Sequence, residues 1–109
     1  MFEQRYHKRG NPEAHIQLQI IHWAKMRGYT IGKIKNKGSR IGNSFIRDPY
    51  QFLGIPDLLL FTPKMYFVEC KAPNGRQSPH QKSFQICCEK AGIPYILAYD
   101  LENVIAKIN

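Results

Sequence analysis

The chain has 109 residues, of which 43% are hydrophobic and 12% aromatic, and it carries a net charge of +8. This composition excludes an intrinsically disordered chain, and no apolar run reaches the ~20 residues that a membrane span needs. We therefore expect one globular domain over residues 1–109, with no membrane segment and no signal peptide in its charged N-terminal region.

The positive charge is concentrated in the first part of the chain. Residues 1–47 contain ten Lys or Arg against two Glu, whereas residues 48–109 contain six basic and six acidic residues. A basic half joined to a neutral half predicts a polyanionic partner, and nucleic acid is the commonest partner of that kind.

A helix is predicted to follow a basic N-terminal arm at residues 1–10. Asn11 and Pro12 are typical of an N-cap and a first helical position, apolar residues follow at helical spacing, and Gly28 ends the pattern. Glu13 in the first turn has two interpretations. It complements the helix dipole, or it reaches a metal cluster from the core-facing stripe that it shares with Ile16.

The next region is basic and weakly structured. Residues 29–34 predict a strand, residues 35–43 a Gly- and Lys-rich turn, and residues 44–46 either a short strand or a loop. The basic and aromatic side chains here suit contact with phosphates and a splayed base, although a solvated loop fits almost as well. The residues expected to bind nucleic acid are Lys33, Lys35, Lys37, Arg40, Arg47 and Arg76.

Two short apolar runs, residues 58–61 and 66–68, predict buried strands joined by a tight turn. Asp57 begins the first strand, and Glu69 and Lys71 end the second on one face, because side chains two residues apart point the same way. A loop of residues 62–64 places Asp57 opposite Glu69, and a loop of residues 63–65 places it opposite Lys71. In both registers two carboxylates and one amine converge at one end of the hairpin.

This convergence predicts a metal site with a lysine beside it. Two like charges held together on a buried sheet are unfavourable without a cation, and Mg²⁺ prefers carboxylate oxygens. An exposed ion pair at the strand ends is the alternative. The strands are too apolar for a surface ribbon, which favours the metal site.

The second half of the chain completes the fold. Ser78 and Gln81 have the spacing of a capping box, so Gln81 either caps a second helix or reaches toward the active site. Gly92 ends this helix, a strand at residues 95–99 and a closing helix at residues 101–108 follow, and the buried stripe of the second helix is predicted at Phe84, Cys87, Cys88 and Ala91. The order helix, three strands, helix, strand, helix predicts an α+β (α/β) fold with a mixed sheet between helices.

The chain contains three cysteines, Cys70, Cys87 and Cys88. Their odd number and apolar surroundings favour reduced core thiols over a disulfide framework or a zinc site. We therefore expect a cytoplasmic protein.

The pair Pro56-Asp57 followed by Glu69-x-Lys71 resembles the PD-(D/E)xK nuclease superfamily, whose restriction-endonuclease-like core has the same αβββαβ order. A closer resemblance, extending from Pro12 to Val104, is to the virus-type replication-repair nuclease (VRR-NUC) family. Each motif is degenerate by itself, but their order and spacing are specific. The motifs are Pro12-Glu13, Gly54-Ile55-Pro56-Asp57, Val68-Glu69-Cys70-Lys71, Ser78-Pro79-His80-Gln81 and Ala91-Gly92-Ile93-Pro94-Tyr95.

The resemblance implies a DNA phosphodiesterase that depends on Mg²⁺ or Mn²⁺. It implies that Asp57, Glu69 and the Cys70 carbonyl bind the metal, and that Glu13 binds it directly or through water. It further implies that Lys71 positions or deprotonates the attacking water and that Gln81 supports the site.

The short chain resembles the stand-alone members of the family, which are found in bacteriophages and some bacteria. That likeness implies a homodimeric endonuclease acting in DNA repair on branched DNA such as Holliday junctions, in a bacterial or phage-infected cytoplasm. Two alternatives stay open: a nuclease that processes flaps or nicks, and a non-catalytic DNA-binding module with the same fold.

Overall fold

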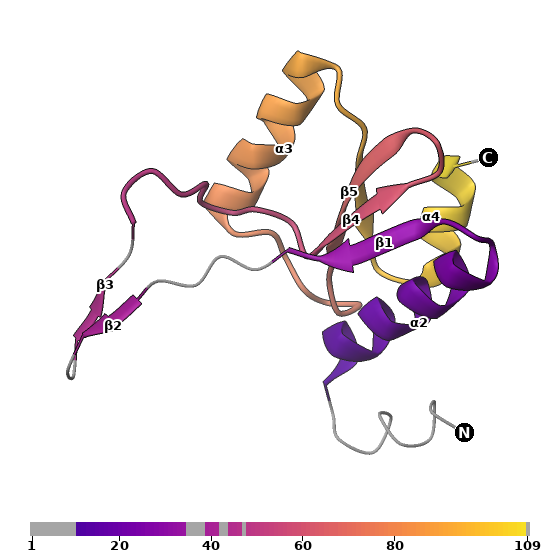
Figure 1. Ribbon diagram of the computed structural model, residues 1–109, viewed down its shortest axis with the longest axis horizontal. Coiled ribbons are helices and arrows are strands. Elements are labelled where there is room, and N and C mark those ends of the chain that lie inside the picture. Colours follow the sequence, from indigo (N-terminus) through magenta and orange to yellow (C-terminus); the bar gives the residue numbers. More distant parts are fainter. Residues whose placement is uncertain (1–10, 35–38, 42–43, 47, 109) are drawn as a thin grey trace.

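The computed structural model describes residues 11–34, 39–41, 44–46 and 48–108 (Figure 1). A four-stranded mixed sheet with the strand order β1-β4-β5-β6 forms its centre, and only the β5–β6 pair is parallel. The elements are α2 (Pro12–Met26), β1 (Thr30–Lys33), β2 (Ser39–Ile41), β3 (Ser44–Ile46), β4 (Leu58–Phe61), β5 (Met65–Cys70), α3 (Pro79–Ala91), β6 (Tyr95–Ala98) and α4 (Leu101–Ile108). The predicted α+β class with a mixed sheet between helices is confirmed.

Helix α2 begins as its sequence predicts. The Asn11 side chain accepts a hydrogen bond from the Ala14 amide at 3.2 Å, and Pro12 needs no partner for a missing N–H. The chain leaves the helix at Gly28, whose φ of +80° is favoured by glycine. Ile16, Ile20 and Ala24 are buried along one stripe, which packs this helix on the sheet.

The β4–β5 hairpin has one of the two predicted registers. Phe61 pairs with Met65 and Leu58 pairs with Val68, so the turn consists of residues 62–64. The Thr62 amide closes the turn by donating to the Lys64 carbonyl at 2.8 Å. Continued by one residue, this register sets Asp57 opposite Glu69.

Helix α3 has both of its predicted ends. Ser78 and Gln81 form a capping box, and Gly92 closes the helix in the left-handed conformation with φ +72°. All three cysteines are free, and Cys70 and Cys88 are buried, but Cys87 is exposed. The predicted burial of Cys87 and Ala91 is wrong, because the helix packs through Phe84 and Cys88, four residues apart, and Cys87 lies about 100° around the helix from Cys88.

A second, two-stranded sheet lies between β1 and β4 in the chain. Ser39–Ile41 pairs with Ser44–Ile46, so the predicted turn at residues 35–43 contains a strand and the open choice for residues 44–46 is resolved as a strand. Figure 1 shows this hairpin standing away from the four-stranded sheet. Residues that favour a turn do not prevent the residues beside them from pairing as two short strands.

The two faces of the four-stranded sheet are covered by different helices. On one face, α2 and α4 pack against alternate residues of β4, β5 and β6, and this core includes Ile20, Leu60, Val68, Ile96 and Val104. On the other face, α3 contributes Phe84 and Cys88 to a smaller cluster with Tyr95, Phe67 and Leu97. Within the described residues, no helix combines the length and apolarity needed to cross a bilayer.

Candidate active site

Asp57 lies at the entrance to β4, where three chain segments meet. Its backbone carbonyl accepts a hydrogen bond from the Ile34 amide at 2.8 Å, just beyond the end of β1. Its side-chain Oδ2 accepts a hydrogen bond from the Cys70 amide at 2.8 Å, on the neighbouring strand β5. Asp57 is therefore tied to both adjacent strands, through its backbone carbonyl on the β1 side and through its carboxylate on the β5 side.

Glu69 is a buried acid in β5, with 1% of its surface exposed. Its Oε2 accepts a hydrogen bond from Gln81 Nε2 at 2.9 Å and lies 3.8 Å from Lys71 Nζ. Its Oε1 is buried, and no N–H or hydroxyl donor for that atom lies among the described residues, although the Asp57 and Glu69 carboxylates are close enough to share a proton. A buried carboxylate oxygen without a donor is unfavourable unless a cation or another group meets it.

The pKa values of both carboxyl groups are raised, in agreement with their burial and their closeness to each other. Burial, followed by the nearby charge of Asp57, raises the pKa of Glu69 to about 8. Burial also raises the pKa of Asp57, although the hydrogen bond from the Cys70 amide opposes that shift. Both groups would therefore ionise more readily beside an added positive charge.

Gln81 performs both of the roles that the sequence left open. Its Oε1 accepts a hydrogen bond from the Ser78 amide at 2.8 Å, which completes the capping box of α3. Its Nε2 is thereby directed to Glu69. One side chain links the start of α3 to the acidic residue of β5.

Gly54 allows α3 to approach this site. Its φ is +74°, and a Cβ atom at this position would overlap the backbone of His80 and Gln81. Glycine is needed here both for the backbone conformation and for the close contact. The sequence marked Gly54 as part of a motif but did not reveal that it touches the helix that carries Gln81.

Lys71 follows β5 directly, and its backbone continues the sheet. Its amide donates to the Ala98 carbonyl at 2.9 Å, beyond the last pair of the β5–β6 register. Its side chain is only 13% exposed. The predicted grouping of Asp57, Glu69 and Lys71 at one end of the hairpin is thus present.

Glu13 and the Cys70 side chain contribute to the site less directly than the sequence suggested. The charge of Glu13, from the start of α2, contributes to the raised pKa of Asp57 and of Glu69. In the part of the chain that the structure describes, however, no three His, Cys, Asp or Glu side chains form a group suited to a metal ion. The Cys70 side chain is buried in the core on the opposite face, so the backbone is the part of Cys70 that reaches the site.

The predicted nucleic-acid contacts are only partly described. Lys33 is exposed at the end of β1 beside Asp57, where it pairs with Leu58, and Arg76 is exposed between β5 and α3. For Arg40, the structure describes the backbone in β2 and not the side chain. Lys35, Lys37, Arg47 and the arm at residues 1–10 lie outside the described residues.

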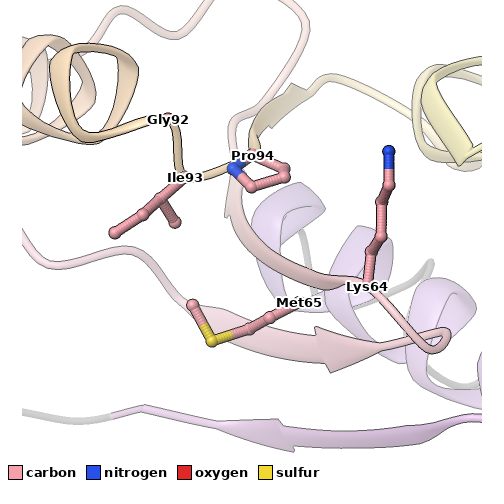
Figure 2. A pocket seen from close by; sticks show the side chains of 5 residues that line it. All are labelled: Lys64, Met65, Gly92, Ile93 and Pro94. Atoms are coloured by element: carbon pink, nitrogen blue, oxygen red, sulfur yellow. The ribbon is translucent and has the colours of Figure 1, made fainter.

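A separate hollow lies at the far end of the β4–β5 hairpin (Figure 2). It has a volume of about 320 Å³ and is lined by Lys64, Met65, Gly92, Ile93 and Pro94. Met65 and Glu69 lie four positions apart along an extended strand, a distance of about 13 Å. None of the described residues that line this hollow is acidic, although Glu89 lines an adjoining hollow that shares Lys64, Ile93 and Pro94.

Comparison with known proteins agrees with the fold. The model of the VRR-NUC domain family matches residues 2–100. A solved structure described as a VRR_NUC domain is similar with a TM-score of 0.68, and it is 22% identical over 91% of this chain and 96% of that chain. This likeness shows a common fold. No curated protein matches the chain.

Proposed function

The chain belongs to the VRR-NUC domain family of nuclease-type domains, and we propose that it is a Mg²⁺- or Mn²⁺-dependent endonuclease that hydrolyses DNA phosphodiester bonds. The observation that carries this proposal is the buried Glu69 carboxylate, opposite Asp57 and beside Lys71, with one oxygen lacking a donor among the described residues. The basic character of residues 1–47 supports a polyanionic substrate.

The residues present fit a hard divalent cation. Asp57, Glu69 and the Cys70 carbonyl would hold it, and all three supply the oxygen ligands that Mg²⁺ prefers. When bound, such an ion neutralises phosphate charge, polarises water and stabilises the leaving oxygen. Glu13 acts on the site through its charge or through water, since it does not join the pair in a three-residue group within the described chain.

The remaining groups position the reaction. Lys71 Nζ, 3.8 Å from Glu69 Oε2, orients the attacking water and adds positive charge beside the phosphate. Gln81 keeps the Glu69 carboxylate aimed into the site and leaves Oε1 available. The Gln81 side chain accepts a hydrogen bond from the Ser78 amide, and the Lys71 amide donates to the Ala98 carbonyl. The site is therefore preorganised before DNA binds.

We further propose that the enzyme selects branched DNA, such as Holliday junctions, and acts as a homodimer. The resemblance to stand-alone members of the family supports this proposal. A chain of 109 residues also offers little surface for gripping two duplex arms, and two symmetric sites could cut two strands of one junction.

The test is cleavage of end-labelled four-way junction, flap and plain duplex DNA with Mg²⁺, Mn²⁺ or EDTA. Wild type is compared with Asp57→Ala and Lys71→Ala, and with Lys64→Ala as a control at the far end of the hairpin. Paired, metal-dependent nicks across the junction that are lost in the first two variants and kept in the third support the proposal.

Other outcomes distinguish the alternatives. Cleavage confined to flaps or nicks keeps the chemistry but rejects the branched substrate. Tight binding without cleavage in any metal rejects the enzyme in favour of a DNA-binding module. A monomeric mass in solution, both alone and bound to a junction, rejects the homodimer.

A further inference from the structure

The loop that joins β5 to α3 is held at both of its ends next to the candidate site. At its start, the Lys71 amide donates to the Ala98 carbonyl at 2.9 Å. At its end, the Gln81 amide donates to Ser78 Oγ at 3.1 Å as part of the capping box. Between them the Gly75 amide donates to the Ala72 carbonyl at 2.8 Å and forms a turn. The loop therefore has a defined backbone path.

A further hydrogen bond ties this loop to the sheet. Gln77 Nε2 donates to the Tyr95 hydroxyl at 3.1 Å, and the two residues are 18 positions apart in the chain. Tyr95 is 8% exposed and pairs with Phe67 in the parallel β5–β6 register. Phe67 and Glu69 are two residues apart in β5, so the side chains of Tyr95 and Glu69 share the face of the sheet that α3 covers.

The raised pKa of Tyr95 is a consequence of this placement. Burial raises it, and the charge of Glu69 raises it further, so the hydroxyl lies within electrostatic reach of the acidic site. None of the roles proposed for Asp57, Glu69, Lys71 and Gln81 uses the bond between Gln77 and Tyr95.

The loop carries one charged side chain, Arg76. The other residues from 72 to 78 are neutral, and Arg76 is exposed next to Gln77. It also lies between Lys71 and Gln81 in the chain, so both anchors of its loop belong to the candidate site. An arginine in this place suits a phosphate, because its planar fork of donors matches two phosphate oxygens.

We propose that Gln77 and Tyr95 are positioning residues, which hold the loop so that Arg76 binds a DNA phosphate next to the one that is cut. This inference rests on the proposed function, since it assumes that DNA occupies the site. A loop that is already tied to the sheet loses little conformational freedom on binding, so more of the interaction with phosphate appears as affinity.

The experiment measures equilibrium binding of four-way junction DNA in EDTA, over a series of salt concentrations, so that no cleavage is required. Arg76→Ala is expected to weaken binding about tenfold and to lower the salt slope by about one, because one phosphate contact is lost. Tyr95→Phe and Gln77→Ala, which break the tie from opposite sides, are each expected to weaken binding about threefold.

Two double variants separate positioning from a purely structural role. If the tie acts through Arg76, adding Tyr95→Phe or Gln77→Ala to Arg76→Ala weakens binding no further, because the contact is already absent. Gln77→Ala alters a half-buried side chain of the loop, so it tests the hydrogen bond to Tyr95 even if Tyr95→Phe folds poorly. Tyr66→Phe is the matched control, because Tyr66 is also 8% exposed but faces the other core.

Two results would overturn the inference. One is an unchanged salt slope in Arg76→Ala, and the other is an equal loss from Tyr95→Phe or Gln77→Ala with and without Arg76. Wild-type protein that binds DNA but never cuts it rejects only the endonuclease, since the binding comparison still decides the role of the loop. Wild-type protein that cuts DNA while Arg76→Ala keeps the full salt slope rejects only the inference.

Discussion

The face of the four-stranded sheet that α2 and α4 cover is built from buried, largely apolar side chains, whereas the face toward α3 combines a small apolar cluster with Glu69. Successive residues of β5 point alternately into these two environments. Val68 and Cys70 point into the larger core, whereas Glu69 between them points toward α3 and accepts a hydrogen bond from Gln81.

This difference shows how a small protein can keep a buried acid. Burying a charge without a full set of partners is unfavourable, and the raised pKa of Glu69 reflects that cost. The apolar core on the opposite face offsets it, because burial of apolar side chains is the largest favourable term in folding. Stability and chemistry therefore reside on opposite faces of the same strands, and each can be changed separately.

The largest expected effect is on the chemical face. Glu69→Gln should reduce cleavage by about a thousandfold, because the neutral amide is a poor ligand for a hard cation. The free energy of unfolding at pH 8 without metal should not fall, because the variant removes a buried charge that disfavours folding. Single-turnover cleavage and denaturant unfolding measure the two effects, with exposed Glu89→Gln as the control. A loss of stability with intact cleavage would contradict the assignment.

The next effect belongs to the apolar face. Leu60 is fully buried in β4, so Leu60→Ala should lower the free energy of unfolding by about 3 kcal/mol. Cleavage by the folded protein at low temperature should stay near the wild-type rate, since this residue points away from Glu69. Leu59→Ala, a half-buried neighbour on the other face, is the control and should cost less stability. Thermal unfolding provides the measurement, and equal losses in both variants would argue against the difference between the faces.

An intermediate effect is expected where α3 meets the loop before β4. Gly54→Ala should cost about 2 kcal/mol of stability and lower cleavage at least about tenfold, because its Cβ would displace the helix turn that carries Gln81. Gly28→Ala is a close control, since φ is +80° at that residue and nothing lies within 4 Å of the added Cβ. It should therefore show the backbone strain alone and keep full cleavage. Equal cleavage by the two variants would contradict the proposed contact.

The last and most gradual effect is a dependence of stability on pH in the metal-free protein. The pKa of Glu69 is raised from 4.5 to about 8 by folding, so the folded state holds a proton that the unfolded state releases between these values. The contribution of this group is fully present below pH 4.5 and is lost as the pH rises toward 8, with a slope of at most about 1.4 kcal/mol per pH unit.

Denaturant unfolding of wild type and Glu69→Gln at several pH values in EDTA isolates that contribution. The stability of wild type relative to the variant should decline with rising pH, and added Mg²⁺ should flatten the decline. A difference that is constant across the range would show that Glu69 has the same pKa in both states.

The sequence alone determined the features that depend on neighbouring residues. Asn11 with Pro12, Ser78 with Gln81, and Gly92 mark helix ends because capping is decided within a few residues. The apolar runs around the turn at residues 62–64 predicted two buried strands, and that pairing was enough to bring Asp57, Glu69 and Lys71 to one end of a hairpin.

The tertiary structure decided what depends on distant segments meeting. It selected the register that sets Asp57 opposite Glu69, and it separated buried Cys88 from exposed Cys87. It also aimed Gln81 at Glu69, placed Gly54 against α3 and joined Gln77 to Tyr95. Each of these contacts joins residues more than ten positions apart or depends on which face of a helix meets the sheet. Local periodicity does not specify such contacts, because they follow from the packing of the whole domain.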